Sequence, residues 1–226
     1  MGALDLVLRG DPTLLAIVRL SLAVTLSATL IASVLGMTLG AVVALTRFPG
    51  RTPLIVGMNG MMGLPPVVVG LLVFLLLSRS GPLGGLGLLF TPGAMIVAQA
   101  VLITPIIAAL TRQVVEDLWA EYRDELTAMQ LGPAGRVAAL LWDARFSLVT
   151  IVLAGFGRAA AEVGAVMIVG GNIDGFTRVM TTSIALETSK GNLALAIGLG
   201  GVLITLILAL NGLAWGVRQW AERHAG

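Results

Sequence analysis

The chain of 226 residues contains no cysteine, and its one histidine, His224, lies among the last three residues. The missing thiols exclude a disulfide framework, a thiolate metal site and thiol catalysis, and one histidine leaves a metalloenzyme without its usual ligands. The sequence also lacks a glycine-rich loop that ends in Lys-Ser or Lys-Thr. No nucleotide-hydrolysing site is therefore encoded, and we expect the chain to bind no cofactor and to be no enzyme.

Charge is scarce as well, because charged residues make up 12% of the chain and hydrophobic residues 57%. Soluble domains carry roughly a quarter charged residues, so the composition indicates an integral membrane protein. The formal net charge of +2 belongs to the loops of such a protein and does not indicate a nucleic-acid partner. Asp5, Arg9 and Asp11 near the N-terminus do not form a signal peptide pattern, so we expect the first apolar run to be retained.

Five apolar runs reach or approach the ~20 residues that a helix needs to cross a ~30 Å hydrocarbon core. They cover residues 14–46, 54–77, 93–115, 147–169 and 192–215. The runs are continuous in Leu, Ile, Val, Ala and Gly, which predicts helices. We expect an all-α membrane protein with about five transmembrane helices in a single domain, residues 1–226.

Basic residues predict how the chain is oriented. If the loop after the first run, the loop from Arg112 through Arg145 and the C-terminal tail share one side, that side holds eight Lys and Arg residues and the other holds five. The positive-inside rule places the richer side in the cytoplasm. An odd number of spans then leaves the N-terminus outside and the C-terminus in the cytoplasm, in a multi-pass protein of the inner membrane.

One polar segment, residues 116–132, holds five of the twelve carboxylates. Its helix-forming residues and closing glycine predict a short helix within the cytoplasmic loop of about residues 116–146. Apolar and aromatic side chains recur every three or four positions along it, at Leu118, Trp119, Tyr122, Leu126 and Met129. This stripe either packs on the chain's own helices or faces a soluble partner, and in both cases one face is presented outward.

Two Pro-containing sites interrupt the apolar runs. Pro65 and Pro66 interrupt the second run, and the helix must kink or restart there. Backbone freed at membrane depth needs protein or water to satisfy it, so the pair is a candidate for the translocation path, although a plain kink explains it equally well. Thr104-Pro105 is a weaker candidate, because Thr can mend the backbone beside a proline.

Arg158 and Glu162 lie four residues apart within the fourth run, on one helical face, and can pair. Charges at this depth are costly and mark a pathway or a mechanical contact, or they fix the rotation of the helix. Because Arg precedes Glu, the less favourable order, we also expect partners on other helices. Farther on, Thr181 and Thr182 offer hydroxyl donors to an anion, although an ordinary loop would use the same residues.

The polar segment and Gly132 resemble the coupling loop of binding-protein-dependent ABC importer permeases, in which a Glu-Ala-Ala motif precedes a glycine by six residues. Here Leu126 stands six residues before Gly132, and Glu125 one place earlier. Several stretches resemble the branch that imports molybdate, tungstate and sulfate, and these are Leu64 to Gly70, Ser78 to Gly84, Ala161 to Ala165 and Gly170 to Asn172. Leu118 to Tyr122, Leu141 to Arg145 and Ala185 to Gly191 are most similar to tungstate permeases.

The resemblance implies a type I importer fold, a homodimer of permeases, two cytoplasmic ATPase subunits that bind ATP, and an external substrate-binding protein. In that assembly the helix around Tyr122 to Gln130 moves with the ATPases. The implied contact residues are Tyr122, Glu125, Leu126, Met129 and Gly132. Molybdate or sulfate are the alternative substrates. A secondary transporter is the rival class, but it requires coupling-ion carboxylates inside the spans, and Glu162 alone qualifies.

Overall fold

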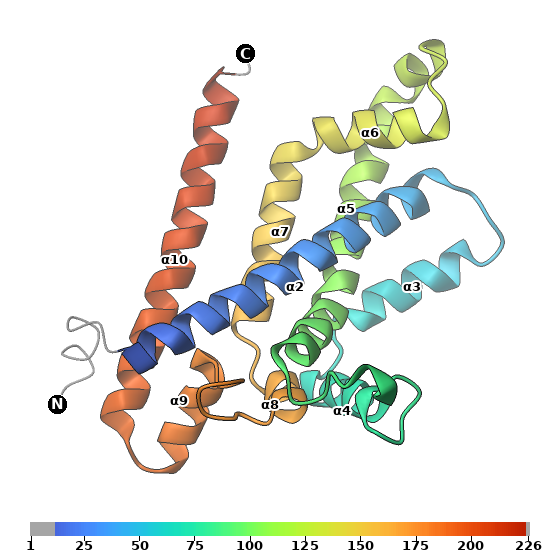
Figure 1. Cartoon of the computed structure of the whole chain (residues 1–226). Helices are drawn as coiled ribbons and strands as arrows, with labels where there is room; N and C mark the ends of the chain where they lie inside the picture. The colour runs from blue at the N-terminus through green and yellow to red at the C-terminus, as the bar shows by residue number, and fades with distance from the viewer. Residues whose placement is uncertain (1–11, 225–226) are drawn as a thin grey trace.

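The computed structural model describes residues 12–224, which form helices joined by short connections and contain no strand. Figure 1 shows the elements in order. They are α2 (Pro12–Leu45), α3 (Arg51–Met61), α4 (Pro66–Leu77), the short 3-10 helix η1 (Gly84–Leu86), α5 (Pro92–Ala128), α6 (Pro133–Asp143), α7 (Arg145–Ala160), α8 (Gly164–Gly170), α9 (Met180–Ser189) and α10 (Leu193–His224). The expected all-α fold is confirmed.

Three helices are long and apolar enough to cross a membrane alone: α2, α5 and the stretch Leu193–Leu213 of α10. Two further crossings are bent pairs, α3 with α4 at 107° and α6 with α7 at 77°. Counting each pair once gives five spans, as the apolar runs predict. The chain is therefore a multi-pass membrane protein.

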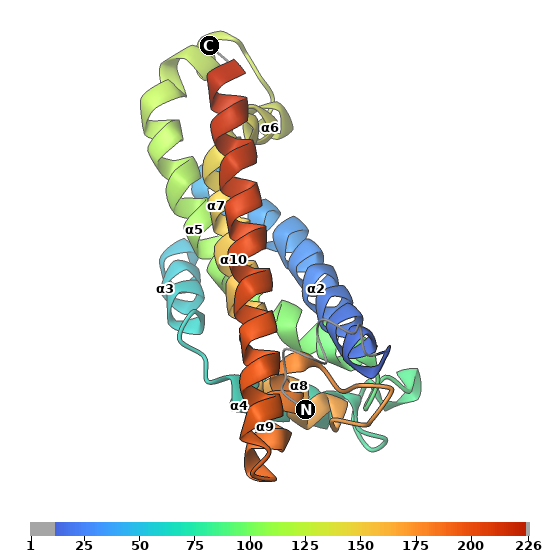
Figure 2. The same cartoon turned by 90° about the vertical axis from the view of Figure 1, so that its left-hand side faces the viewer.

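Helix α5 is the centre of the molecule. Met95, Ile103 and Ile107 on this helix are completely buried, and α2 crosses α5 over much of its length (Figures 1 and 2). The two backbones approach closely at Gly40, where a Cβ atom would clash with the carbonyl oxygen of Ala108. Small residues thus allow α2 to lie directly on α5.

The second expected span breaks where its proline pair predicts a kink or restart. Helix α3 ends at Met61, Pro65 is the N-cap of α4, and Pro66 is the first residue of that helix. Proline suits this first position because its missing N–H would have no helical partner there. Pro105, by contrast, lies inside an unbroken α5, where the Thr104 hydroxyl donates to the carbonyl of Ala100 at 2.7 Å.

Two expected boundaries differ from the structure. The fourth span, expected over residues 147–169, stops at Ala160, and after three connecting residues the chain continues as the seven-residue α8. The polar segment is not a separate short helix, because α5 runs without interruption to Ala128. Residues 116–128 contain no Gly or Pro to end the helix, and their charged residues are good helix formers, so the helix leaves the apolar region without a break.

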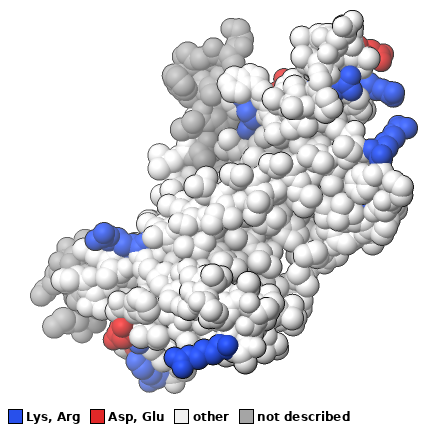
Figure 3. Space-filling view, turned by 45° about the vertical axis from the view of Figure 1, so that its right-hand side comes forward, with Lys and Arg blue, Asp and Glu red and all other residues white. Residues whose placement is uncertain are grey.

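The helices leave two polar ends. Figure 1 places α6 and the C-terminal end of α10 at one end, and α4, α8 and α9 at the other. On the face shown in Figure 3, Lys, Arg, Asp and Glu gather towards the two ends, and the surface between them is largely free of charge. The prediction of orientation from basic residues assumes two such ends, and α6 lies at the end that it places in the cytoplasm.

Candidate translocation and coupling sites

The breaks of the second and fourth spans lie against each other. A Cβ atom at Gly70 of α4 would be 2.6 Å from the Cα atom of Ala165 in α8, and one at Gly164 would be 2.9 Å from Val67. Such distances leave no room for a side chain, so α4 and α8 are in backbone contact. The structure therefore brings Pro65 and Pro66, at the start of α4, to the same region as the break after Ala160.

Glu162 is the polar centre of this region, and 3% of its surface is exposed. One carboxylate oxygen accepts a hydrogen bond from Arg158 at 2.8 Å, and the other accepts the backbone N–H of Ala165 at 3.0 Å. The predicted i,i+4 pair is confirmed. The contact from another helix reaches the main chain of Glu162 and not its carboxylate: the Thr181 hydroxyl of α9 donates to the Glu162 carbonyl at 2.8 Å. These bonds satisfy backbone groups that the break would otherwise leave unpaired.

Both candidate threonines are buried and have partners within the protein. The Thr182 hydroxyl donates to the carbonyl of Val179 and accepts its N–H, both at 3.1 Å. Thr181 holds Glu162 as described above. In this conformation the two hydroxyls therefore support the start of α9. Their expected contact with a passing anion stays a prediction.

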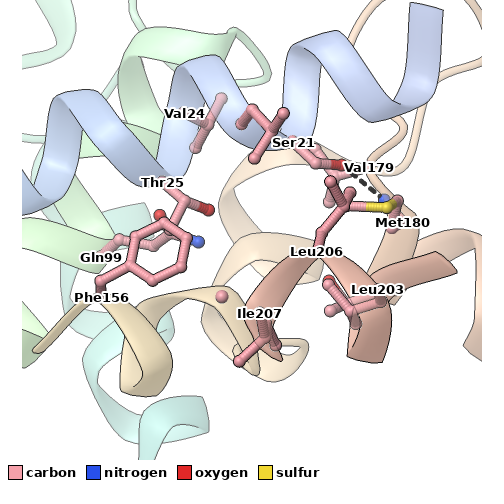
Figure 4. Close-up of a pocket in the computed structure, with 13 residues that line it drawn as sticks. Ser21, Val24, Thr25, Gln99, Phe156, Val179, Met180, Leu203, Leu206 and Ile207 are labelled. Carbon is pink, nitrogen blue, oxygen red and sulfur yellow. Dashed lines mark hydrogen bonds between the residues drawn. The ribbon is translucent and has the colours of Figure 1, made fainter. Parts of the chain in front are cut away.

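A small cavity lies beside the break, between α2, α5, α7, the start of α9 and α10 (Figure 4). Its volume is about 20 Å³, enough for roughly one water molecule and too small for a tetrahedral oxyanion. The buried Gln99 amide lines it and donates to the carbonyl of Ala159 at 3.1 Å, near the end of α7. Ser21 accepts the N–H of Met180 at 2.8 Å, which ties α2 to α9. In this conformation the cavity therefore does not serve as a binding site for such an anion.

At the opposite end, the side chains of the apolar stripe pack against α6. Leu126 and Leu140 are buried in one cluster with Ala41 and Val115, and the partly buried Trp119 and Tyr122 border it. The Arg136 guanidinium lies 5.6 Å from the centre of the Trp119 ring. The stripe therefore joins α5 to α6, which is one of its two expected roles, and the end of α5 and α6 form one packed unit.

The remaining coupling candidates face outward. Glu125 is exposed, Met129 is 66% exposed, and Gly132 is the exposed N-cap of α6. A further residue, Trp142 on α6, is 72% exposed, and the Arg145 guanidinium lies 5.2 Å from the centre of its ring. A large aromatic side chain left open at a polar end is typical of a contact surface. Its position next to Asp143 in a mixed segment gave no periodic signal.

An ion cluster connects the coupling end to the second span, and sequence analysis did not find it. Glu116 of α5 pairs with Arg112 one turn earlier and with Arg51, the first residue of α3. Arg51 also donates through Nε to the carbonyl of Val43 at 2.9 Å. The cluster thus joins the end of α2, the start of α3 and the polar part of α5. Arg51 and Glu116 lie 65 residues apart, too far for any local pattern to predict the contact.

Comparison with known proteins gives the family. No protein-family model matches the chain. It is 41% identical over 207 residues, 88% of each chain, to a probable anion ABC transporter permease protein of Haloferax volcanii. It is 37% identical over 218 residues, 96% of each chain, to the tungstate uptake system permease protein TupB of Peptoclostridium acidaminophilum. A sulfate transport system permease protein CysW of Escherichia coli is 28% identical over 223 residues, 93% of this chain and 75% of that protein. The chain belongs to the ABC transporter permease family.

Proposed function

We propose that this chain is the membrane permease of an importer for tungstate, driven by ATP that separate subunits bind and hydrolyse. The observation that carries the proposal is the 37% identity over 96% of both chains to a permease named for tungstate uptake. A second protein with that name, from Campylobacter jejuni, is 43% identical over 147 residues, 65% of this chain and 62% of that protein. The sulfate permease is more distant at 28%, which makes sulfate the weaker alternative.

In the proposed assembly this chain works with a second copy of itself, with ATPase subunits and with a substrate-binding protein. Two copies of the chain pair in the membrane, two ATPase subunits bind at the α6 end, and a binding protein delivers the anion at the end formed by α4, α8 and α9. The sequence supports this division of labour, because it contains no Gly-rich loop followed by Lys-Ser or Lys-Thr. The permease supplies the path and the transmission of movement, while ATP is bound elsewhere.

The packing of the helices suggests how movement passes from the α6 end to the region of the breaks. Contact with an ATPase at Met129, Gly132 and Trp142 moves α6 together with the end of α5, because Leu126 and Leu140 share one buried cluster. Helix α5 is continuous from there to Gln99, about 40 Å away along the helix axis. Gln99 holds the carbonyl of Ala159. A shift of α5 therefore reaches the region where the second and fourth spans break.

Two features of the break suit alternating access, in which the path opens to one side at a time. Broken helices are typical of transporter sites, and each break here lets one half of a span move relative to the other. The ion pair and the Thr181 contact give the closed arrangement specific partners that an open arrangement must exchange. Glu162 is already bonded to Arg158 and Ala165, so it is not a free carboxylate of the kind that a secondary transporter needs.

Uptake by whole cells tests the proposal. Cells that lack their own tungstate and molybdate importers are given this permease with its ATPase and binding protein, and the tungsten, molybdenum and sulfur they accumulate are measured by mass spectrometry. We expect tungsten uptake that excess sulfate does not inhibit. Sulfur uptake that tungstate leaves unchanged would contradict the choice of substrate, and tungsten uptake without the ATPase subunit would contradict the transporter class.

A further inference from the structure

An apolar groove lies between α2, α3 and α5 and reaches Met61, the last residue of α3 before the break of the second span. Its volume is about 490 Å³, within the ~300–1,000 Å³ range of small-molecule sites. Leu35 and Leu39 of α2, Leu54 of α3, and Val97 and Val101 of α5 are among its lining residues. No charged side chain lines it, and the hydroxyl of Thr104, its polar lining group, already donates to the carbonyl of Ala100. Nothing in the groove can hold a polar ligand along its length.

The groove has the length of one leaflet of a bilayer. Its lining residues extend from Ile31 to Leu39 on α2 and from Val97 to Pro105 on α5. Eight helical steps cover about 12 Å, and one leaflet of a ~30 Å hydrocarbon core is about 15 Å deep. An acyl chain that entered from one leaflet would therefore fill the groove.

A cation stands at the polar end of the groove. Leu39 and Leu54 are the lining residues nearest in sequence to the turn between α2 and α3, and that turn contains Arg47. Arg51, one turn before Leu54, is paired with Glu116, which Arg112 also shares. Arg47 is exposed, and it takes part in none of the ion pairs formed between described side chains. The turn therefore has one positive charge that no carboxylate of the described chain neutralises.

The carboxylate next to Glu116 on α5 does not change this balance. Asp117 follows Glu116 directly on α5 and is exposed. A single helical step turns a side chain by about 100°, so Asp117 points away from the face on which Glu116 meets Arg51. The corner formed by α2, α3 and α5 remains basic.

We propose that this groove binds a phospholipid with an anionic headgroup. One acyl chain occupies the groove, and the headgroup phosphate lies at the α2–α3 turn, where Arg47 neutralises it and the outer edge of the Arg51 pair supplies further positive potential. Basic sites between transmembrane helices, followed by an apolar groove, match the two parts of such a lipid. The proposal does not depend on which anion the permease carries.

A second copy of the chain fits the groove less well. The apolar stretches α2, α3 with α4, and residues 193–213 of α10 carry no Asp or Glu that could reach Arg47. A helix from another copy would therefore cover the arginine without a counter-charge, which is costly at the edge of a membrane. A lipid phosphate provides the charge that these helices lack.

Native mass spectrometry of the delipidated full-length protein tests the site. We expect each permease to retain one phosphatidylglycerol, and to bind phosphatidylcholine with the same acyl chains roughly fivefold more weakly. Arg47→Gln should remove this preference without preventing lipid binding. Leu54→Trp, which fills the groove, should reduce binding of both lipids. The matched controls Arg79→Gln, at the other polar end, and Val56→Trp, on α3 outside the groove, should behave like the parent protein.

A second measurement keeps the test valid if the Leu54→Trp protein folds poorly. The natural chain has no cysteine, so a single cysteine at Leu54 can carry a fluorophore, and brominated phosphatidylglycerol should quench it more than brominated phosphatidylcholine does. Equal quenching together with an unaltered preference in Arg47→Gln would overturn the proposal. So would efficient cross-linking between copies through cysteines at Leu54 and Val101, because it would show that a second permease occupies the groove.

Discussion

Arg158 donates a hydrogen bond of 2.8 Å to Glu162 across the end of α7, at the point where the fourth span stops being a helix. The second oxygen of the same carboxylate accepts the N–H of Ala165 at the start of α8. One buried side chain thus connects both sides of the break. Glu162 neutralises Arg158 on one side of the break and accepts the Ala165 N–H on the other.

Glu162→Gln separates these two roles. The amide oxygen can still accept the Ala165 N–H, but the charge that neutralises Arg158 is lost. Because Arg158 remains 33% exposed, we expect a loss of about 1–3 kcal/mol in unfolding free energy and a marked fall in transport. Thermal unfolding in detergent and anion uptake measure the two effects. Glu162→Ala should be worse on both, since it also removes the acceptor, and a Glu162→Gln protein that equals the parent in both assays would refute the role of the pair.

Gly70 tests the contact between the two breaks. Gly70→Ala places a Cβ atom 2.6 Å from the backbone of Ala165, so α4 and α8 must separate, at a cost of about 1–3 kcal/mol. We expect a lower melting temperature and impaired transport. Gly57→Ala on α3 is the matched control, because nothing lies within 4 Å of its added Cβ atom. If both alanine variants melt alike, the close approach of α4 and α8 is wrong.

The two tryptophans at the α6 end should separate folding from coupling. Trp142→Ala removes a 72% exposed side chain, so stability should change by less than about 0.5 kcal/mol, while stimulation of the ATPase by the permease should fall. Trp119→Ala opens the cluster between α5 and α6 and should cost about 1–3 kcal/mol. Melting curves and ATPase assays of the reconstituted complex distinguish them. Full stimulation by Trp142→Ala would remove this residue from the contact surface.

Glu125 lies on the same exposed surface, on the last turns of α5. Its charge reversal, Glu125→Arg, should leave the fold intact and uncouple ATP hydrolysis from transport. ATP turnover per anion imported is the quantity to measure. Asp117→Arg is a control on the same helix. Unchanged stimulated hydrolysis in Glu125→Arg would argue against contact with the ATPase at this residue.

The predicted sidedness can be measured because the chain lacks cysteine. A cysteine at Ser80, in the connection after α4, should react with a membrane-impermeant maleimide on intact cells. A cysteine at Ala134, on α6, should react only after the cells are opened. Both positions are exposed, so access to the reagent depends on the side of the membrane. The reverse pattern would invert the predicted orientation.

Local chemistry explains which parts of this structure the sequence predicts. The break at Pro65 and Pro66 and the pairing of Arg158 with Glu162 depend on neighbouring residues, and both are confirmed. Helix α5 continues past residue 115, the expected end of the third span, because the polar residues that follow favour helix themselves. The Arg51–Glu116 pair and the Thr181 bond to Glu162 join distant segments, and only packing of the whole chain creates them.

The central claim is that this permease carries tungstate when a separate ATPase works. Proteoliposomes that contain the permease and its ATPase subunits, supplied outside with the binding protein and equal amounts of tungstate, molybdate and sulfate, test it most directly. Metal and sulfur inside the vesicles are measured by mass spectrometry while ATP hydrolysis is followed. We expect tungsten inside the vesicles only when ATP is present, and in excess over molybdenum and sulfur. Tungsten entry at the same rate without ATP, or accumulation of sulfate in place of tungstate, would contradict this proposal.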